Sequence, residues 1–141
     1  MSRYAEAHSN PAGPGDARPT ALQVIKDEAV EGKLAGKVIV ITGTSSGIGI
    51  ETARALSLTG ARLLLTARDL DKAKSALDGI LERERVELVE MDNTSLASVR
   101  AAAKAILQKS NGQVNVLVNN AGIMALPKLE HTKDGFEMQF G

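Results

Sequence analysis

The stretch Lys37–Gly49, KVIVITGTSSGIG, decides the fold of this chain. It opens with four β-branched residues, 38–41, which predict a buried strand. Three glycines then mark the passage from that strand into a helix. Gly43 permits a tight turn, Gly47 removes a side chain where the backbone would approach a ligand, and Gly49 allows close packing of helix on strand.

This turn predicts a phosphate-binding loop. The first amides of a helix have no partner inside it, and they lie at the positive end of the helix dipole. Thr44, Ser45 and Ser46 are expected to add hydroxyl groups around the same pocket. A glycine pattern alone also fits an ordinary strand-to-helix turn, so the rest of the chain has to decide.

Composition limits the other function classes. The 141 residues include 17 basic, 17 acidic and no cysteine residues, and 43% are apolar, which suits one α/β domain. Balanced, scattered charge argues against a nucleic-acid partner. Without cysteine, and with only His8 and His131 as imidazoles, no metal site is expected. No apolar run reaches the ~18 residues of a membrane span or forms a signal core, which predicts a cytoplasmic protein.

The chain is predicted to contain three parts. Residues 1–20 are rich in proline and glycine and are expected to be a disordered arm. Residues 21–35 follow as a short helical arm on the outside of the domain. Residues 36–141 form a nucleotide-binding domain of the Rossmann type, which we expect to be truncated.

Strands and amphipathic helices alternate within that domain. The predicted strands cover residues 38–41, 62–67, 86–89 and 114–118. The predicted helices follow the glycine loop, cover residues 70–81, and begin after a cap at Thr94 or Ser95. This α/β alternation predicts a parallel sheet with strand order 3-2-1-4 and ligands at the carboxyl ends of its strands. The glycine loop, Arg68, Asp92 and residues 119–122 all follow strand ends, so they should meet at one edge.

Four motifs together resemble the amino-terminal half of the short-chain dehydrogenases/reductases. They are TGTSSGIG, the arginine of TARD, MDN after the third strand and NNAG after the fourth. SSGIGIETARAL and DGFEMQFG resemble the branch that contains retinol dehydrogenases and the WW-domain oxidoreductase. The resemblance covers residues 36–141 and implies a pocket for NAD or NADP.

The resemblance also implies roles for single residues. Ile48 would offer its backbone to the phosphates near the nicotinamide, and Asp92 would lie beside the adenine. Asn120, Ala121 and Gly122 would line the ribose and adenine side. We expect Asn119 to be structural, since its amide can satisfy backbone groups where neighbouring strands end.

Arg68 favours NADP over NAD. It lies near the end of the second strand, where an acidic residue would accept the ribose 2′-hydroxyl of NAD, whereas a guanidinium can pair with a 2′-phosphate. Asp69 could instead turn inward and repel that phosphate, but we expect it to face solvent.

The resemblance implies carbonyl or alcohol chemistry that needs a tyrosine, a lysine four positions later and a serine. The only tyrosine is Tyr4, and His8 stands four positions after it, so no catalytic residue is predicted. The chain stops at Gly141, inside what resembles the fifth helix, which suggests the cofactor-binding portion of an enzyme.

Two other readings stay open at this point. The chain could be a non-catalytic dinucleotide-binding or interaction module. Another nucleotide fold is disfavoured, because a P-loop needs Gly-Lys-Ser/Thr where Ile50 follows Gly49, and a methyltransferase has no use for NNAG. In either reading the apolar fourth strand has no neighbour on its outer edge, which predicts self-association.

Overall fold

The computed structural model describes residues 3–140, which contain five helical elements and four strands. In chain order these are η1 (Glu6–His8), α1 (Ala21–Asp27), β1 (Val38–Ile41), α2 (Ile48–Ser57), β2 (Arg62–Ala67), α3 (Leu70–Ala76), β3 (Val86–Glu90), α4 (Leu96–Lys109) and β4 (Val116–Val118). Among these residues no helix has both the length and the apolarity needed to cross a membrane.

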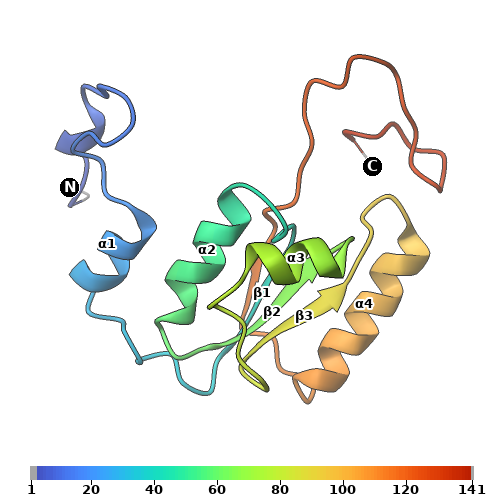
Figure 1. Ribbon diagram of the computed structural model, residues 1–141, viewed down its shortest axis with the longest axis horizontal. Coiled ribbons are helices and arrows are strands. Elements are labelled where there is room, and N and C mark those ends of the chain that lie inside the picture. Colours follow the sequence, from blue (N-terminus) through green and yellow to red (C-terminus); the bar gives the residue numbers. More distant parts are fainter. Residues whose placement is uncertain (1–2, 141) are drawn as a thin grey trace.

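The four strands form one parallel sheet in the order β3-β2-β1-β4 (Figure 1). This confirms the α/β fold and the strand order expected from the sequence. Val38 of β1 lies opposite Arg62 of β2, and Ile39 lies opposite Val116 of β4. Because all strands run the same way, the loops that follow them meet at one edge of the sheet.

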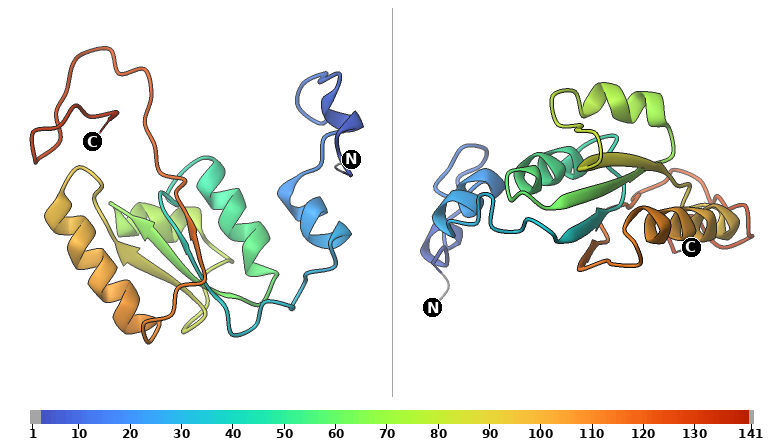
Figure 2. Two further views of the ribbon diagram at one scale, coloured as in Figure 1. Left: turned by 180° about the vertical axis from the view of Figure 1, so that it is seen from behind. Right: turned by 90° about the horizontal axis from the view of Figure 1, so that it is seen from below.

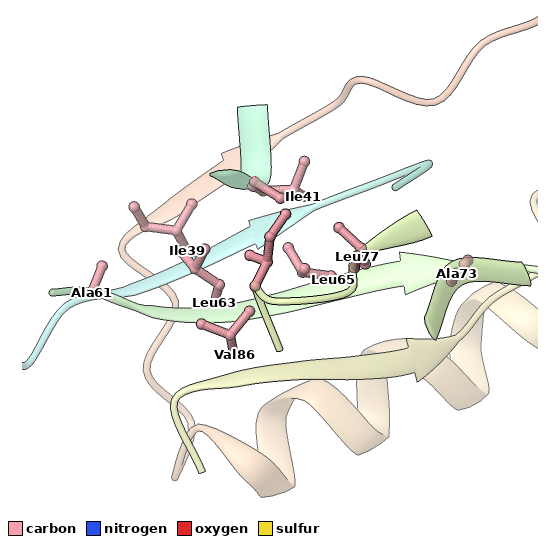
Figure 3. Packing of buried hydrophobic residues seen from close by; sticks show 11 residues of the cluster. Ile39, Ile41, Ala61, Leu63, Leu65, Ala73, Leu77 and Val86 are labelled. Carbon is pink, nitrogen blue, oxygen red and sulfur yellow. The ribbon is translucent and has the colours of Figure 1, made fainter. Parts of the chain in front are cut away.

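Helices cover both faces of the sheet, α2 and α3 on one side and α4 on the other (Figure 2). Successive residues of β1 point to opposite faces, so Ile39 and Ile41 pack beneath α2 while Val38 and Val40 pack against the α4 side. This explains why β1 is apolar throughout rather than alternating. Figure 3 shows the buried cluster between the sheet and the side of α2 and α3, to which Ile39 and Ile41 belong.

The predicted element boundaries are correct to within a few residues, with one helix markedly shorter. β2 has the predicted bounds, β3 extends one residue beyond Val89, and β4 begins at Val116 rather than Val114. The helix predicted over 70–81 ends at Ala76, although Ile80 beyond it remains buried. Apolar spacing therefore marked the buried residues correctly and overestimated the length of helix.

The prediction of a fifth helix near the end of the chain is wrong. Residues 119–140 contain turns and one isolated bridge, between His131 and Glu137, but no helix or strand. Gly135 has a φ of 88°, and Phe136 is 53% exposed. A short helix is stabilised mainly by burying its apolar face. Within residues 3–140 the apolar side chains of this segment, Phe136 and Phe140, lie exposed, so a helix here would gain little from packing.

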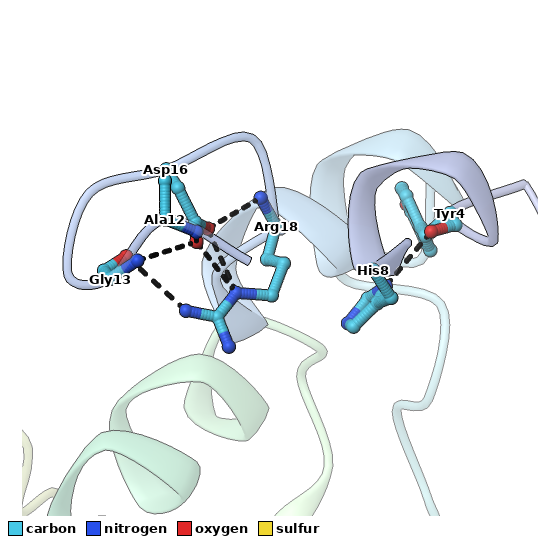
Figure 4. Close-up of polar contacts among 6 residues, drawn as sticks. All are labelled: Tyr4, His8, Ala12, Gly13, Asp16 and Arg18. Atoms are coloured by element: carbon cyan, nitrogen blue, oxygen red, sulfur yellow. Dashed lines mark hydrogen bonds and ion pairs between the residues drawn. The ribbon is translucent and has the colours of Figure 1, made fainter. Parts of the chain in front are cut away.

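The amino-terminal arm contains η1 and a compact turn built on Asp16 (Figure 4). Asp16 accepts hydrogen bonds from the amides of Ala12 and Gly13 and from the Arg18 side chain. The Arg18 guanidinium, and then its amide, hold the pKa of Asp16 well below its usual range. Tyr4 joins the arm to α1 through a 2.9 Å hydrogen bond to Asp27. The disorder expected for residues 1–20 stays a prediction.

Candidate functional site

A pocket of about 800 Å³ lies where the strands end. The structure brings all eleven predicted site residues to its lining. They are Gly43, Ser45, Ser46, Gly47, Ile48, Gly49, Arg68, Asp92, Asn120, Ala121 and Gly122. They come from the loops after all four strands, so the convergence expected at this edge is present in the fold.

Close packing or backbone conformation requires glycine at each of the three positions. Gly43 has a φ of 71°, and an added Cβ would lie 2.8 Å from the Cα of Ala121. A Cβ on Gly49 would overlap the carbonyl oxygen of Gly43 and lie 2.7 Å from Nδ2 of Asn120. Gly47 has a φ of 60° and a ψ of −140°, a conformation open essentially to glycine alone, with open space around it. The loop thus packs tightly on its inner side and is unobstructed at Gly47.

The amino terminus of α2 opens onto the pocket. Gly47 is its N-cap and supplies no side-chain hydrogen bond, so within the described residues the first turn is not capped by a side chain. Ile48 at this end is 78% exposed. Uncapped amides at the positive end of a ten-residue helix form a site suited to an anion such as a phosphate.

The NNAG segment fixes the shape of the glycine loop. Nδ2 of Asn120 donates to the carbonyl oxygens of Thr42, at 2.8 Å, and Gly43, at 3.1 Å. Oγ1 of Thr42 accepts from the amides of Asn120 and Ala121 in return. Asn120 therefore makes the strand-joining contacts that the sequence assigned to Asn119, which is exposed. The structural role was therefore predicted one position too early, because the side-chain amide of Asn120, and not that of Asn119, faces β1.

One hydroxyl expected in the pocket is absent from its lining. Thr44 is fully buried, and both its amide and its Oγ1 donate to the carbonyl oxygen of Thr66. Thr44 thus ties the loop to β2, while Ser45 and Ser46 remain at the pocket.

Two cationic side chains, Arg68 and Lys72, line the pocket beyond the end of β2. Arg68 is exposed, and neither it nor Lys72 belongs to an ion pair within residues 3–140. Asp69 between them is exposed, but it also lines the pocket, and its carboxylate caps α3 by accepting from the Lys72 amide at 2.9 Å. Lys72 was not predicted, although a second basic residue four positions after Arg68 in TARDLDK, in the first turn of the helix expected there, could have indicated it.

Asp92 after β3 is held by two residues. Its Oδ1 accepts from the amide of Thr94 at 3.0 Å and from its hydroxyl at 2.8 Å, and its Oδ2 accepts from Lys133 at 2.8 Å. Lys133, and then Thr94, lower the pKa of Asp92 to about 2. The carboxylate is therefore charged at neutral pH and fixed in direction.

The last segment of the chain forms part of the pocket wall. Thr132, Met138 and Gln139 line the pocket. Sequence reasoning missed them because it expected a helix here, and only the fold brings this segment opposite the end of β3.

Together these features define a Rossmann-type α/β domain, with a glycine-rich turn entering a helix at the ligand edge of a parallel sheet. The family model for short chain dehydrogenases matches residues 37–140, and the chain belongs to this family.

Curated relatives agree with the predicted family and branch. Short-chain dehydrogenase/reductase prx1 of Penicillium roqueforti is 56% identical over 137 residues, which are 97% of this chain and 40% of that protein. The WW domain-containing oxidoreductase of Pongo abelii is 41% identical over 89% of this chain and 30% of its own. Retinol dehydrogenase 12 of Homo sapiens is 41% identical over 77% of this chain and 35% of its own. The chain thus spans less than half the length of these relatives.

A similar solved structure contains NADP. It is a metagenomic short-chain oxidoreductase in complex with NADP, 40% identical, with a TM-score of 0.55. The match covers 64% of this chain and 41% of that one.

Proposed function

We propose that this chain is the NADP(H)-binding portion of a short-chain dehydrogenase/reductase, an oxidoreductase acting on alcohol or carbonyl groups. The observation that carries this proposal is the pairing, in one pocket, of the uncapped α2 terminus with the cations Arg68 and Lys72. The NADP complex of a similar protein supports it.

The residues present fit a dinucleotide. Its diphosphate would be held by the amides at Gly47 and Ile48, where the backbone is unobstructed and no side chain occupies the cap. Asp92 and the segment 120–122 would hold the adenosine side. When bound, the nicotinamide ring supplies a hydride acceptor or donor, and the chain's own residues bind and orient it.

Arg68 and Lys72 would select the phosphorylated cofactor. Two cations that line the same pocket can meet a 2′-phosphate, whereas the ribose 2′-hydroxyl of NAD gains little from them. The carboxylate of Asp69 is engaged with the Lys72 amide, so its acceptor oxygen is directed to the helix cap. Asp69 keeps its negative charge at the pocket lining, so the preference for NADP requires that Arg68 and Lys72 together outweigh its repulsion of the phosphate.

Arg68→Asp tests this assignment. Loss of a charge-assisted contact to the 2′-phosphate should weaken NADPH binding roughly 10- to 100-fold in a nicotinamide fluorescence titration, while NADH affinity changes by less than about threefold. Arg100→Asp, at an exposed arginine of α4 outside the pocket lining, is the matched control and should leave both affinities unchanged. Equal weakening of NADPH and NADH by Arg68→Asp refutes the 2′-phosphate assignment.

We further propose that this chain binds its cofactor without turnover. Its one tyrosine, Tyr4, donates its hydroxyl to Asp27 in the amino-terminal arm and does not line the pocket. The alternative function is accordingly a non-catalytic dinucleotide-binding or interaction module. NADPH-dependent reduction of a panel of aldehydes and ketones by the purified chain would contradict this second proposal.

Self-association through β4 is the partner interaction that we propose. Val116 and Leu117 of this strand are 45% and 56% exposed, and its outer side pairs with no strand among residues 3–140. A second copy could add its own strand at this edge and cover both side chains.

A further inference from the structure

The segment 132–134 is fastened to the loop that leads from β3 into α4. Nζ of Lys133 lies 2.8 Å from Oδ2 of Asp92, and the Lys133 amide donates to the carbonyl oxygen of Thr94 at 2.8 Å. Oδ2 of Asp134 accepts from the Leu96 amide at 2.7 Å. These three contacts join residues about 40 positions apart at the adenine side proposed for the pocket.

These contacts determine which acceptor positions of Asp92 remain open. A carboxylate oxygen can accept about two hydrogen bonds. Oδ1 already accepts two from Thr94, whereas Oδ2 accepts only from Lys133 among the described residues. The Asp92 side chain lines the pocket and is 15% exposed. One acceptor position, on Oδ2, is thus left for a donor in the pocket.

We propose that Lys133 is a positioning residue for base recognition, holding Asp92 so that its open acceptor position receives the exocyclic 6-amino group of adenine. The inference rests on the proposed function, which brings a base to this side of the pocket. A purine base that lacks this amine carries only a C–H group at position 6, so it offers no donor there and leaves the acceptor position of Asp92 empty. Lys133 itself is 68% exposed and does not line the pocket, so it acts through Asp92.

The test compares two cofactors that differ in this one group. NADPH and its analogue with unsubstituted purine in place of adenine are titrated into the chain by nicotinamide fluorescence. The unmodified protein should prefer NADPH about tenfold, the effect of one hydrogen bond to a charged carboxylate. Lys133→Met should lower this preference to about threefold or less, mostly by weakening NADPH binding.

Three further variants isolate the role of the ion pair. Lys128→Met removes an exposed lysine five positions before Lys133, outside the pocket lining, and should leave the preference unchanged. Lys133→Arg keeps the charge and should restore it. In an Asp92→Asn background, where the preference is already reduced, Lys133→Met should change it no further, because the two residues act as one unit.

Each outcome bears on the inference separately from the proposed function. An unmodified protein that binds both cofactors equally overturns the inference and leaves the proposed function standing. Equal weakening of both cofactors by Lys133→Met also overturns it, since Lys133 would then only support the fold. If the unmodified protein binds neither cofactor at millimolar concentration, both proposals fail.

Discussion

The two edges of the sheet are built differently. β3 carries two acidic residues, Glu87 and Glu90, among its buried valines, and α4 covers one of its faces. β4 at the opposite edge reads Val-Leu-Val, and its first two residues are 45% and 56% exposed. Charged residues on an edge strand discourage pairing with another chain. β3 therefore has the composition of an edge, whereas β4 has that of an interior strand.

Glu87 shows how an acidic side chain on the β3 edge finds basic partners. Its two oxygens accept from Arg62, at 2.8 Å, and from Lys109, at 2.6 Å. Arg62 comes from the neighbouring strand and Lys109 from the end of α4, so three elements meet at one carboxylate. On β4 no charged side chain performs this task, because the strand has none.

The largest expected effect comes from comparing β4 with the interior strand β2, which is buried from Leu63 to Ala67. Leu64→Ala should lower the free energy of unfolding by about 2–5 kcal/mol, since Leu64 is completely buried and leaves a cavity. Leu117→Ala on β4 should cost less than about 1 kcal/mol, because that side chain is already half exposed. Urea denaturation of both variants measures the difference, and equal losses would mean that β4 is covered in solution.

Leu117→Lys should have the next largest effect, on association rather than folding. A charge in the middle of β4 would be buried by strand pairing, so the dissociation constant for self-association should rise roughly tenfold or more. Sedimentation velocity over a range of concentrations measures it. Glu90→Lys on the β3 edge is the control and should change little. A chain that stays monomeric, with one concentration-independent thermal transition, contradicts the proposed association.

Glu87→Gln should have the smallest effect and the clearest pH dependence. Lys109, and then Arg62, lower the pKa of Glu87 below its ordinary value of 4.5. The stabilisation is therefore present above about pH 4.5 and is lost as the pH falls through the lowered pKa. Because these side chains are partly exposed, we expect about 1 kcal/mol at pH 7. The two proteins should converge in acid, and a difference that persists at pH 2 would assign the effect to packing.

Sequence reasoning reached most of the fold and the site because both depend on local signals. The run at 38–41 and the glycines after it specify a strand, a turn and a helix within a few residues. Alternation of strands and helices then specifies a parallel sheet, and parallel strands bring the residues that follow them to one edge.

The errors arose where orientation or distant contact decides the outcome. Asn119 and Asn120 have the same chemistry, and only the direction in which β4 ends determines which amide faces β1. Thr44 is turned into the core for a similar reason. Met138 and Gln139 reach the pocket through the contacts of Lys133 and Asp134 with residues about 40 positions earlier, which no local pattern shows.

The hydrogen bonds of Asn120 impose an order on the maturation of the pocket. The glycine motif leaves the ribosome early, but Nδ2 of Asn120, which braces Thr42 and Gly43, lies 77 to 78 positions further along the chain. Closing so long a loop is slow compared with forming a local turn. Nascent chains that end before β4 would carry the complete glycine sequence in an unbraced loop. Competence for cofactor would therefore arise only once the fourth strand has been synthesised and docks beside the first.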